Sequence, residues 1–209
     1  MSVKPSFFKK YIRVLANFLI DIKFGAFLGG NVKTPYSDMG AYDTVNTSYG
    51  ILPLLFSDKI TPADVLVDVG CGKGRVINWW LDQGNKNKII GIELDSEIAN
   101  KTAIRLSKYN NVEIISGNAV DMLPADGTLF YLYSPFNEEV MIRFSEKLKS
   151  LFMGKSNIRL IYYNPEHVKV FESDPDWKVK RLDVGSANIY HDPVMVELTG
   201  GGSDSKSPA

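Results

Sequence analysis

The sequence has little of several features that would otherwise suggest a function. One cysteine among 209 residues excludes an intrachain disulfide framework and fits a reducing compartment. There are only two histidines, and neither has metal-ligand spacing, so no metal site is predicted. Neither charge is in excess, because 24 Lys and Arg residues balance 24 Asp and Glu residues. Nucleic acid is therefore not the expected partner, since its binding usually needs a basic surplus, although a local basic patch would be compatible with this balance.

Long apolar runs are also missing. No stretch approaches the roughly 20 apolar residues that span a bilayer. The N-terminus has no apolar core followed by a small-residue cleavage site, so a secretory signal is not predicted. We expect a cytoplasmic protein. No feature of the sequence specifies its oligomeric state.

The chain divides into three parts by composition. We expect an extension over residues 1–60, an alternating β/α domain over 61–198 and a tail over 199–209. The tail is rich in Gly and Ser and has nothing to bury, so it is predicted to be disordered.

The extension begins with an amphipathic helix that Gly25 is expected to end. Its apolar residues recur at helical spacing: Phe8, Tyr11, Ile12, Leu15, Phe18, Leu19 and Ile22. Residues 1–24 carry five basic residues and one acid, Asp21, so their net charge is +4. The favoured interpretation is a helix packed on the domain or on a partner subunit. The alternative is peripheral contact with an anionic membrane surface.

Gly, Pro, Ser, Asn and Tyr dominate residues 29–51 without a clear period, which predicts an ordered loop. Three tyrosines, Tyr36, Tyr42 and Tyr49, suggest two roles for this loop. They could form a lid that stacks on a ligand, or they could pack the extension onto the domain.

From residue 61 apolar strands alternate with helices. The strands are predicted at 65–69, 88–93, 112–116, 128–133, 159–163, 177–183 and 189–198. The helices are predicted at 74–83, 96–109 with Ser96 as N-cap, 137–151 with Asn137 as N-cap, and 166–171. The pattern predicts a doubly wound α/β fold. Its mainly parallel seven-stranded sheet should end in an antiparallel C-terminal edge hairpin, and the N-terminal helical extension should precede it.

The first strand leads into a glycine-rich loop at residues 68–75, Asp-Val-Gly-Cys-Gly-Lys-Gly-Arg. Glycines at 70, 72 and 74 allow a sharp turn and close approach to a ligand, and the following helix directs free N–H groups there. The third glycine of a dinucleotide fingerprint would fall at Arg75, and a Walker A sequence is absent. Asp68 would repel a pyrophosphate and attract an ammonium group. The loop therefore favours S-adenosylmethionine, which has an ammonium and no phosphate.

Polar residues also end the next three strands. Glu93, about 20 residues beyond the glycine loop, is placed to accept hydrogen bonds from ribose hydroxyls. Asn118, followed by Ala119, can face the adenine amino group. Pro135 cannot continue a central strand, so Ser134 should lie at the rim beside the ligand.

With these motifs, residues 61–198 resemble the class I S-adenosylmethionine-dependent methyltransferases. The resemblance implies that Asp68 lies near the methionine part of the cofactor and that Glu93 holds the ribose. It implies that Gly70, Gly72 and Gly74 pack against the cofactor, with Cys71 as a small space-filling residue between them. The family often has Asp where Asn118 stands, and Asn retains an acceptor for the adenine amino group.

The residues after the fourth strand depart from one family pattern. Methyltransferases that act on amino groups commonly have Asp/Asn-Pro-Pro-Tyr/Phe, whereas this chain has Ser134-Pro135-Phe136. The chain is similar to small bacterial methyltransferases of mostly unassigned substrate, some of which accompany surface-polysaccharide genes. We therefore predict methylation of a small molecule or glycan, at oxygen. A protein or nucleic-acid methyltransferase and a non-catalytic cofactor-binding module are the alternatives, and Asp68 and Arg75 argue against a nicotinamide dehydrogenase.

A hydroxyl substrate can require a general base. His167 follows the fifth strand at the expected active-site edge, and its titration range suits a base, although a surface or capping role is the alternative. Tyr36 is the second catalytic candidate. His191 falls in the expected terminal hairpin and is a weaker candidate.

Overall fold

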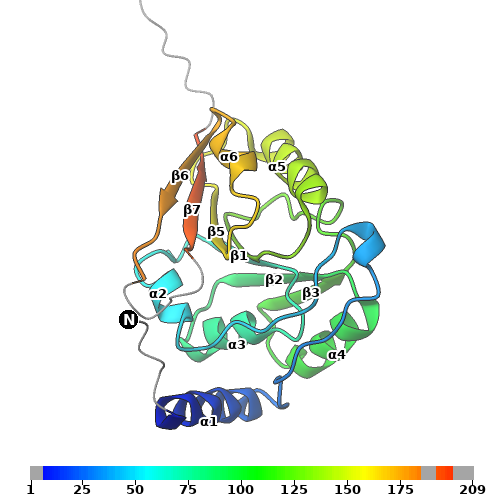
Figure 1. Cartoon of the computed structure of the whole chain (residues 1–209), viewed down its shortest axis with the longest axis vertical. Helices are drawn as coiled ribbons and strands as arrows, with labels where there is room; N and C mark the ends of the chain where they lie inside the picture. Colours follow the sequence, from blue (N-terminus) through cyan, green and yellow to red (C-terminus); the bar gives the residue numbers. More distant parts are fainter. Residues whose placement is uncertain (1–6, 185–191, 200–209) are drawn as a thin grey trace, which may run out of the picture.

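The computed structural model describes residues 7–184 and 192–199, and it describes only the backbone of residues 7–11 and 13. The predicted mixed sheet is confirmed (Figure 1). Its strands lie in the order β3-β2-β1-β4-β5-β7-β6. Their bounds are β1 Val65–Val69, β2 Lys88–Glu93, β3 Val112–Ser116, β4 Leu129–Tyr133, β5 Arg159–Tyr163, β6 Trp177–Arg181 and β7 Val194–Leu198.

The first five strands are parallel, and the predicted antiparallel hairpin closes one edge. β7 lies between β5 and β6 and is antiparallel to both. β1, β2 and β3 follow one another toward one edge of the sheet, and the chain then returns to place β4 on the other side of β1. This reversal places the switch point beside the carboxyl end of β1, where ligands bind in open α/β sheets.

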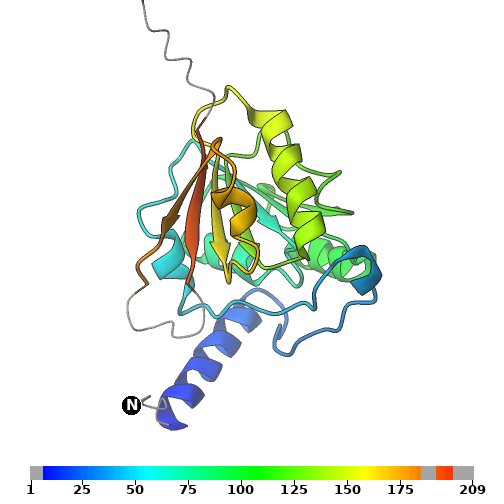
Figure 2. The same cartoon turned by 45° about the horizontal axis from the view of Figure 1, so that its top comes forward.

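The helices are α1 Phe7–Lys23, α2 Leu52–Phe56, α3 Arg75–Asp82, α4 Ser96–Leu106, α5 Glu138–Phe152 and α6 Lys169–Glu172, with a 3₁₀ turn at Ser37–Met39. α3 and α4 lie on one face of the sheet, and α5 and α6 lie on the other (Figures 1 and 2). α2 was not predicted, because five residues that begin Leu52-Pro53 are too short to show a helical period.

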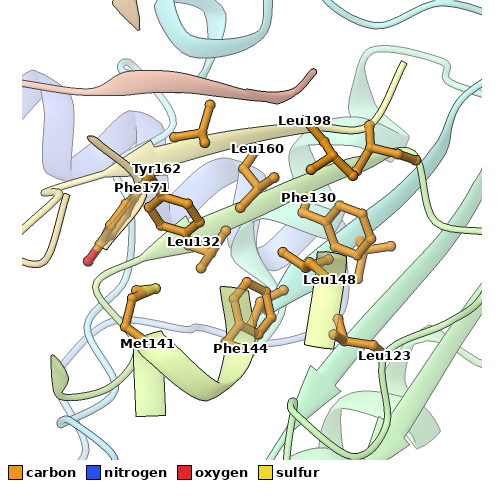
Figure 3. Close-up of a cluster of buried hydrophobic side chains, with 14 of the residues drawn as sticks. Leu123, Phe130, Leu132, Met141, Phe144, Leu148, Leu160, Tyr162, Phe171 and Leu198 are labelled. Carbon is orange, nitrogen blue, oxygen red and sulfur yellow. The ribbon is translucent and has the colours of Figure 1, made fainter. Parts of the chain in front are cut away.

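Alternation along the central strands divides the core into two clusters. Phe130 and Leu132 of β4 face the α5 side, whereas Leu129 and Tyr131 face the α3 side. Figure 3 shows the first cluster, in which Phe144 of α5 lies among side chains from β4 and β5. Successive side chains of a strand point to opposite faces, and here both faces are covered. The central strands therefore appear as continuous apolar runs in the sequence.

Several predicted boundaries are wrong. β6 ends at Arg181 and not at 183, and β7 begins at Val194 and not at 189. The N-cap of α4 is Asp95 and not Ser96, because the Asp95 carboxylate accepts hydrogen bonds from two backbone N–H groups of the first turn. α4 ends at Leu106 and not near residue 109, and α6 is shorter than the predicted 166–171 segment and begins later. Asn137 is the N-cap of α5, as predicted. His191 and all of the predicted tail except Thr199 lie outside the described residues.

Of the favoured interpretation, packing on the domain or on a partner subunit, the first part is wrong for the side chains described in the stripe, and the second part stays a prediction. Ile12, Leu15, Phe18, Leu19 and Ile22 are all exposed. Within residues 7–184 and 192–199, no helix is long and apolar enough to cross a bilayer.

Candidate functional site

A cavity lies at the carboxyl ends of the parallel strands, at the predicted switch point. Its floor contains Asp68 and Gly70 from the end of β1, Glu93 from the end of β2, and Asn118 from beyond β3. Four predicted cofactor residues are thus brought to one cavity, and Cys71 and Ala119 line it as well.

The glycine loop is held against β2 by backbone hydrogen bonds. The N–H groups of Gly70 and Cys71 both donate to the carbonyl of Ile92, each at 2.9 Å. Gly72 has φ +51°, and a Cβ there would lie 2.6 Å from Cγ2 of Thr44. Gly74 is the N-cap of α3 and packs on α4. Gly72 and Gly74 therefore shape the loop, while Gly70 and Cys71 form the cavity surface.

Glu93 is buried and fixed by two backbone donors. Its Oε2 accepts from the Gly72 N–H at 2.8 Å, and its Oε1 accepts from the Asp95 N–H at 2.9 Å. Burial raises the pKa of Glu93 in spite of these bonds. Each carboxylate oxygen has a further lone pair, so the orientation of Glu93 is set and acceptor capacity for a ligand remains.

Asp68 is 3 % exposed, and its Oδ2 has no hydrogen-bond partner among the described residues. Burial, with the nearby charge of Glu93, raises the pKa of Asp68 to about 8. Unpartnered buried carboxylate oxygens are rare and costly, so this one calls for a donor from outside the chain. An ammonium group would satisfy it. The two carboxylates thus fit a ligand with a cationic amine at one point and vicinal hydroxyls at another.

Asn118 lines the cavity, but its side chain is partly engaged. Its Oδ1 accepts a hydrogen bond from the Val120 N–H at 2.9 Å, which closes the turn after β3. That bond fixes the amide and leaves one acceptor site on the oxygen.

The opposite wall comes from the extension, between Val32 and Thr47, which supplies eleven lining residues. Two short bridges hold this wall: Val32 pairs with Thr44, and Ala41 pairs with Phe136 beyond β4. The Thr47 hydroxyl lies 2.8 Å from the phenol oxygen of Tyr131, at the base of the cavity. The predicted ordered loop is therefore part of the cavity.

The three tyrosines of this loop have different positions. Tyr42 lines the cavity, and its phenol oxygen lies 3.2 Å from Nε2 of His167. Tyr49 is buried and its phenol donates to Asp21, so its role is packing of the extension. Tyr36 and His167 are not among the described residues that line the cavity. The structure thus connects His167 to the cavity through Tyr42 and does not bring Tyr36 there.

Ser134 is buried behind the rim. It has φ +38° and does not line the cavity, whereas Tyr133, Pro135 and Phe136 do. Cys71 is buried, and that burial together with the charges of Asp68 and Glu93 raises the pKa of its thiol well above its usual value. The Cys71 thiol is therefore protonated and suits the space-filling role.

Sequence reasoning missed Asp21 and Arg75, which form an ion pair beneath the glycine loop. One signal was present: Asp21 is the only acid in an apolar, basic helix. It also missed Thr44 and Thr47, for which an aperiodic loop offers no signal. Among the described residues, no group of three or more His, Cys, Asp or Glu side chains could hold a metal ion.

Comparison with known proteins finds similarity to methyltransferases over part of the chain. Residues 66–152 match the model of a methyltransferase domain family. A protein-lysine N-methyltransferase of Saccharolobus islandicus is 27 % identical over 96 residues, which are 44 % of this chain and 60 % of the relative. The match thus spans less than two thirds of that relative.

Solved structures share the fold at low identity. An RNA methyltransferase from Salinibacter ruber, in complex with S-adenosyl-L-homocysteine, has a TM-score of 0.57 and 16 % identity, over 79 % of this chain and 100 % of that one. Mitomycin 7-O-methyltransferase MmcR has a TM-score of 0.59 and 14 % identity, over 72 % of this chain and 54 % of that one. These relatives differ in the substrates that their names state.

Proposed function

We propose that this chain is a class I S-adenosylmethionine-dependent methyltransferase that transfers a methyl group to a hydroxyl of a small molecule or glycan. The match to a methyltransferase domain model over residues 66–152, the methyltransferase relative and the shared fold support the first part of this proposal. The observation that carries the proposal is the pairing of Asp68 and Glu93 in one cavity, with one Asp68 oxygen buried and unpartnered. Asp68 would hold the ammonium of the cofactor, Glu93 its ribose hydroxyls, and Asn118 with Ala119 its adenine.

Bound there, the cofactor would supply an activated methyl group, so the chain's own task is alignment and exclusion of water. The wall over Val32–Thr47 covers the cavity from the side opposite the strands. Aromatic side chains at Tyr42, Tyr133 and Phe136 line the part of the cavity nearest the end of β4. These rings favour an acceptor with an apolar or sugar face.

Hydroxyl methylation also needs a place for the proton. We propose that His167 is the final acceptor and that Tyr42 connects it to the substrate. The cofactor would supply the methyl group to the hydroxyl oxygen, with its carbon–sulfur bond broken and the sulfur leaving as a neutral thioether. The hydroxyl proton would then pass to the Tyr42 oxygen, and the Tyr42 proton would pass to Nε2 of His167. Burial and the charge of Glu166 raise the pKa of Tyr42, so this phenol is neutral and can relay a proton.

Two observations disfavour the alternative substrates. The side-chain oxygen of Asn137 caps α5 through the Val140 N–H at 3.0 Å, so this amide does not replace the missing amine-binding group. The cavity is lined by four acids and two bases, namely Asp43, Asp68, Glu93, Asp95, Lys33 and Arg75. Asp68 and Glu93 are assigned to the cofactor, so Asp43 and Asp95 remain against Lys33 and Arg75. This lining has no basic surplus for a nucleic-acid acceptor.

The first test is cofactor binding by calorimetry. S-adenosylmethionine and S-adenosylhomocysteine should both bind, and Glu93→Ala should weaken binding by at least about 30-fold, because hydrogen bonds to a charged group are lost. Glu113→Ala, an exposed acid on the adjacent strand, is the matched control and should bind normally. Absence of binding to either compound would overturn the proposal.

The second test identifies the acceptor. The protein is incubated with methyl-labelled cofactor and cell extract, and label is counted in protein, nucleic-acid, glycan and small-molecule fractions. Label in glycans or small molecules is expected. Label confined to protein or nucleic acid would contradict the substrate class, and binding without any transfer would favour a non-catalytic module.

A further inference from the structure

The side of α1 that faces away from the domain is an apolar surface. Ile12, Leu15, Leu19 and Ile22 follow helical spacing and form one stripe, and Phe18 lies beside it. These five side chains are between 41 % and 60 % exposed. Phe27 extends the stripe beyond the helix, with its ring centroid 5.7 Å from that of Phe18. Contiguous exposed apolar surfaces of this kind usually mark interaction sites.

α1 holds this surface in a fixed position. Its C-terminal end is anchored by Asp21, which is fully buried and bonded to Arg75, Tyr49 and the backbone of Leu28. Phe24 is buried just after the helix. Figure 2 shows the rest of α1 projecting away from the sheet and its covering helices. The stripe is thus displayed on an anchored helix and not on a free arm.

The charges of α1 indicate which kind of partner fits the apolar stripe. The helix carries four basic residues, Lys9, Lys10, Arg13 and Lys23, and its one acid is the buried Asp21. Lys23 pairs with Asp82 of α3, whereas the helix contains no further acid to balance the other three. Basic residues on an apolar helix match an anionic lipid surface, where hydrophobic burial and attraction to headgroups add.

We infer that α1 docks this protein on the surface of an anionic bilayer, lying in the interface through the stripe of Ile12, Leu15, Phe18, Leu19 and Ile22. A second copy of the chain fits less well, because stripe-to-stripe packing would bring two basic helices together. The inference does not depend on methyl transfer.

Flotation of the full chain with lipid vesicles tests this inference. Vesicles of phosphatidylcholine with 30 % phosphatidylglycerol (about one lipid in three, a usual choice for an anionic surface) should bind the protein at least about tenfold more tightly than phosphatidylcholine alone. Binding should weaken as salt rises, because headgroup attraction is screened. Equal binding to both vesicles, or no binding, would overturn the inference.

Two double variants locate the contact. Leu15→Gln with Leu19→Gln should reduce binding to anionic vesicles by about tenfold or more, since two exposed side chains that enter the lipid are made polar. Ile104→Gln with Ile142→Gln changes two exposed apolar residues on α4 and α5 and should leave binding unchanged. Because all four side chains are exposed, circular dichroism should show normal folding.

The outcomes separate lipid from protein partners. Equal loss in both double variants would overturn the assignment to α1. A dimer in sedimentation velocity that Leu15→Gln with Leu19→Gln abolishes, without vesicle binding by the parent chain, would assign the stripe to a second copy. Cofactor binding by the Leu15→Gln, Leu19→Gln variant is expected to be normal, so its loss of vesicle binding would not reflect failure of the proposed methyltransferase site.

Discussion

Asp21 of α1 and Arg75, the first residue of α3, form a buried ion pair with two nitrogen–oxygen contacts of 3.2 and 2.6 Å. The Tyr49 phenol also donates to Asp21, at 2.9 Å. A single carboxylate thus joins the N-terminal helix, the loop that walls the cavity and the helix that follows the glycine loop. Arg75, which argued against a dinucleotide fingerprint in the sequence, connects the extension to the domain.

Asp21→Ala should lower the free energy of unfolding by about 3–5 kcal/mol, because it leaves the Arg75 guanidinium buried without its counter-ion. Urea denaturation monitored by Trp fluorescence measures the change. Lys23→Ala, on the same helix as Asp21, removes an exposed ion pair with Asp82 of α3. It should lower the free energy of unfolding much less. Equal losses of unfolding free energy in the two variants would show that the buried ion pair stabilises the fold no more than the exposed one does.

The pH dependence of stability should report Asp68. Its pKa is raised to about 8 by burial and by Glu93, whereas in the unfolded chain it titrates near 4. Between these values the folded chain holds a proton that the unfolded chain has released, so stability falls as pH rises, by up to about 1.4 kcal/mol per pH unit. The side chain in Asp68→Asn cannot titrate, so this variant should lose less stability than the parent protein as pH rises. Unfolding of both proteins at pH 5, 6 and 7 tests it, and parallel profiles would contradict a raised pKa.

Cofactor binding should reverse this protonation. If Asp68 holds the ammonium of S-adenosylmethionine, its ionised form is favoured in the complex, and binding near pH 6.5 should release close to one proton. Calorimetry in buffers of different ionisation enthalpy counts that proton. Affinity should rise by up to about tenfold per pH unit between pH 5.5 and 7.5. Binding with no proton release would place the ammonium elsewhere.

The strands and the cavity floor could be predicted because local signals define them. β1 and β2 are short β-branched runs, and parallel pairing brings their carboxyl ends together, so Asp68 and Glu93 were expected at one edge. The wall at Thr44 and Thr47 could not be predicted in the same way. Its residues follow no period, and their positions depend on bridges to Phe136 and Tyr131, which are distant in sequence.

The face of α1 that packs on the domain could not be predicted from the sequence. The period of α1 predicted the helix correctly, but a period cannot say which face is covered. The exposed stripe reverses the usual inference that apolar residues face the core. Ile20 packs against the core, but the most deeply buried of the described residues of α1 is the acid Asp21. Its burial is possible only because Arg75, 54 positions away, supplies the counter-ion.

Gly72→Ala should displace the wall from the glycine loop. An alanine there would adopt an unfavourable positive φ and bring its Cβ to 2.6 Å from Thr44 Cγ2. We expect lower stability and weaker cofactor binding. Gly84→Ala is the matched control, because it has φ +76° but no atom within 4 Å of the added Cβ, so it has the backbone strain without the clash. Adding Thr44→Ser to Gly72→Ala removes the clashing methyl and should recover binding. Failure to recover would assign the whole effect to strain.

His167 and Tyr42 should matter for transfer and not for cofactor affinity. His167→Gln removes the proposed proton acceptor and should lower kcat on the acceptor identified by labelling by about 100-fold, the scale of general-base catalysis. Tyr42→Phe breaks the 3.2 Å contact and should lower kcat in the same direction, with the dissociation constant of S-adenosylmethionine unchanged in both variants. Tyr36→Phe alters a tyrosine of the same loop that does not line the cavity, so it should retain full activity. Unchanged kcat in His167→Gln, or equal losses of kcat in Tyr36→Phe and Tyr42→Phe, would remove His167 from the proton path.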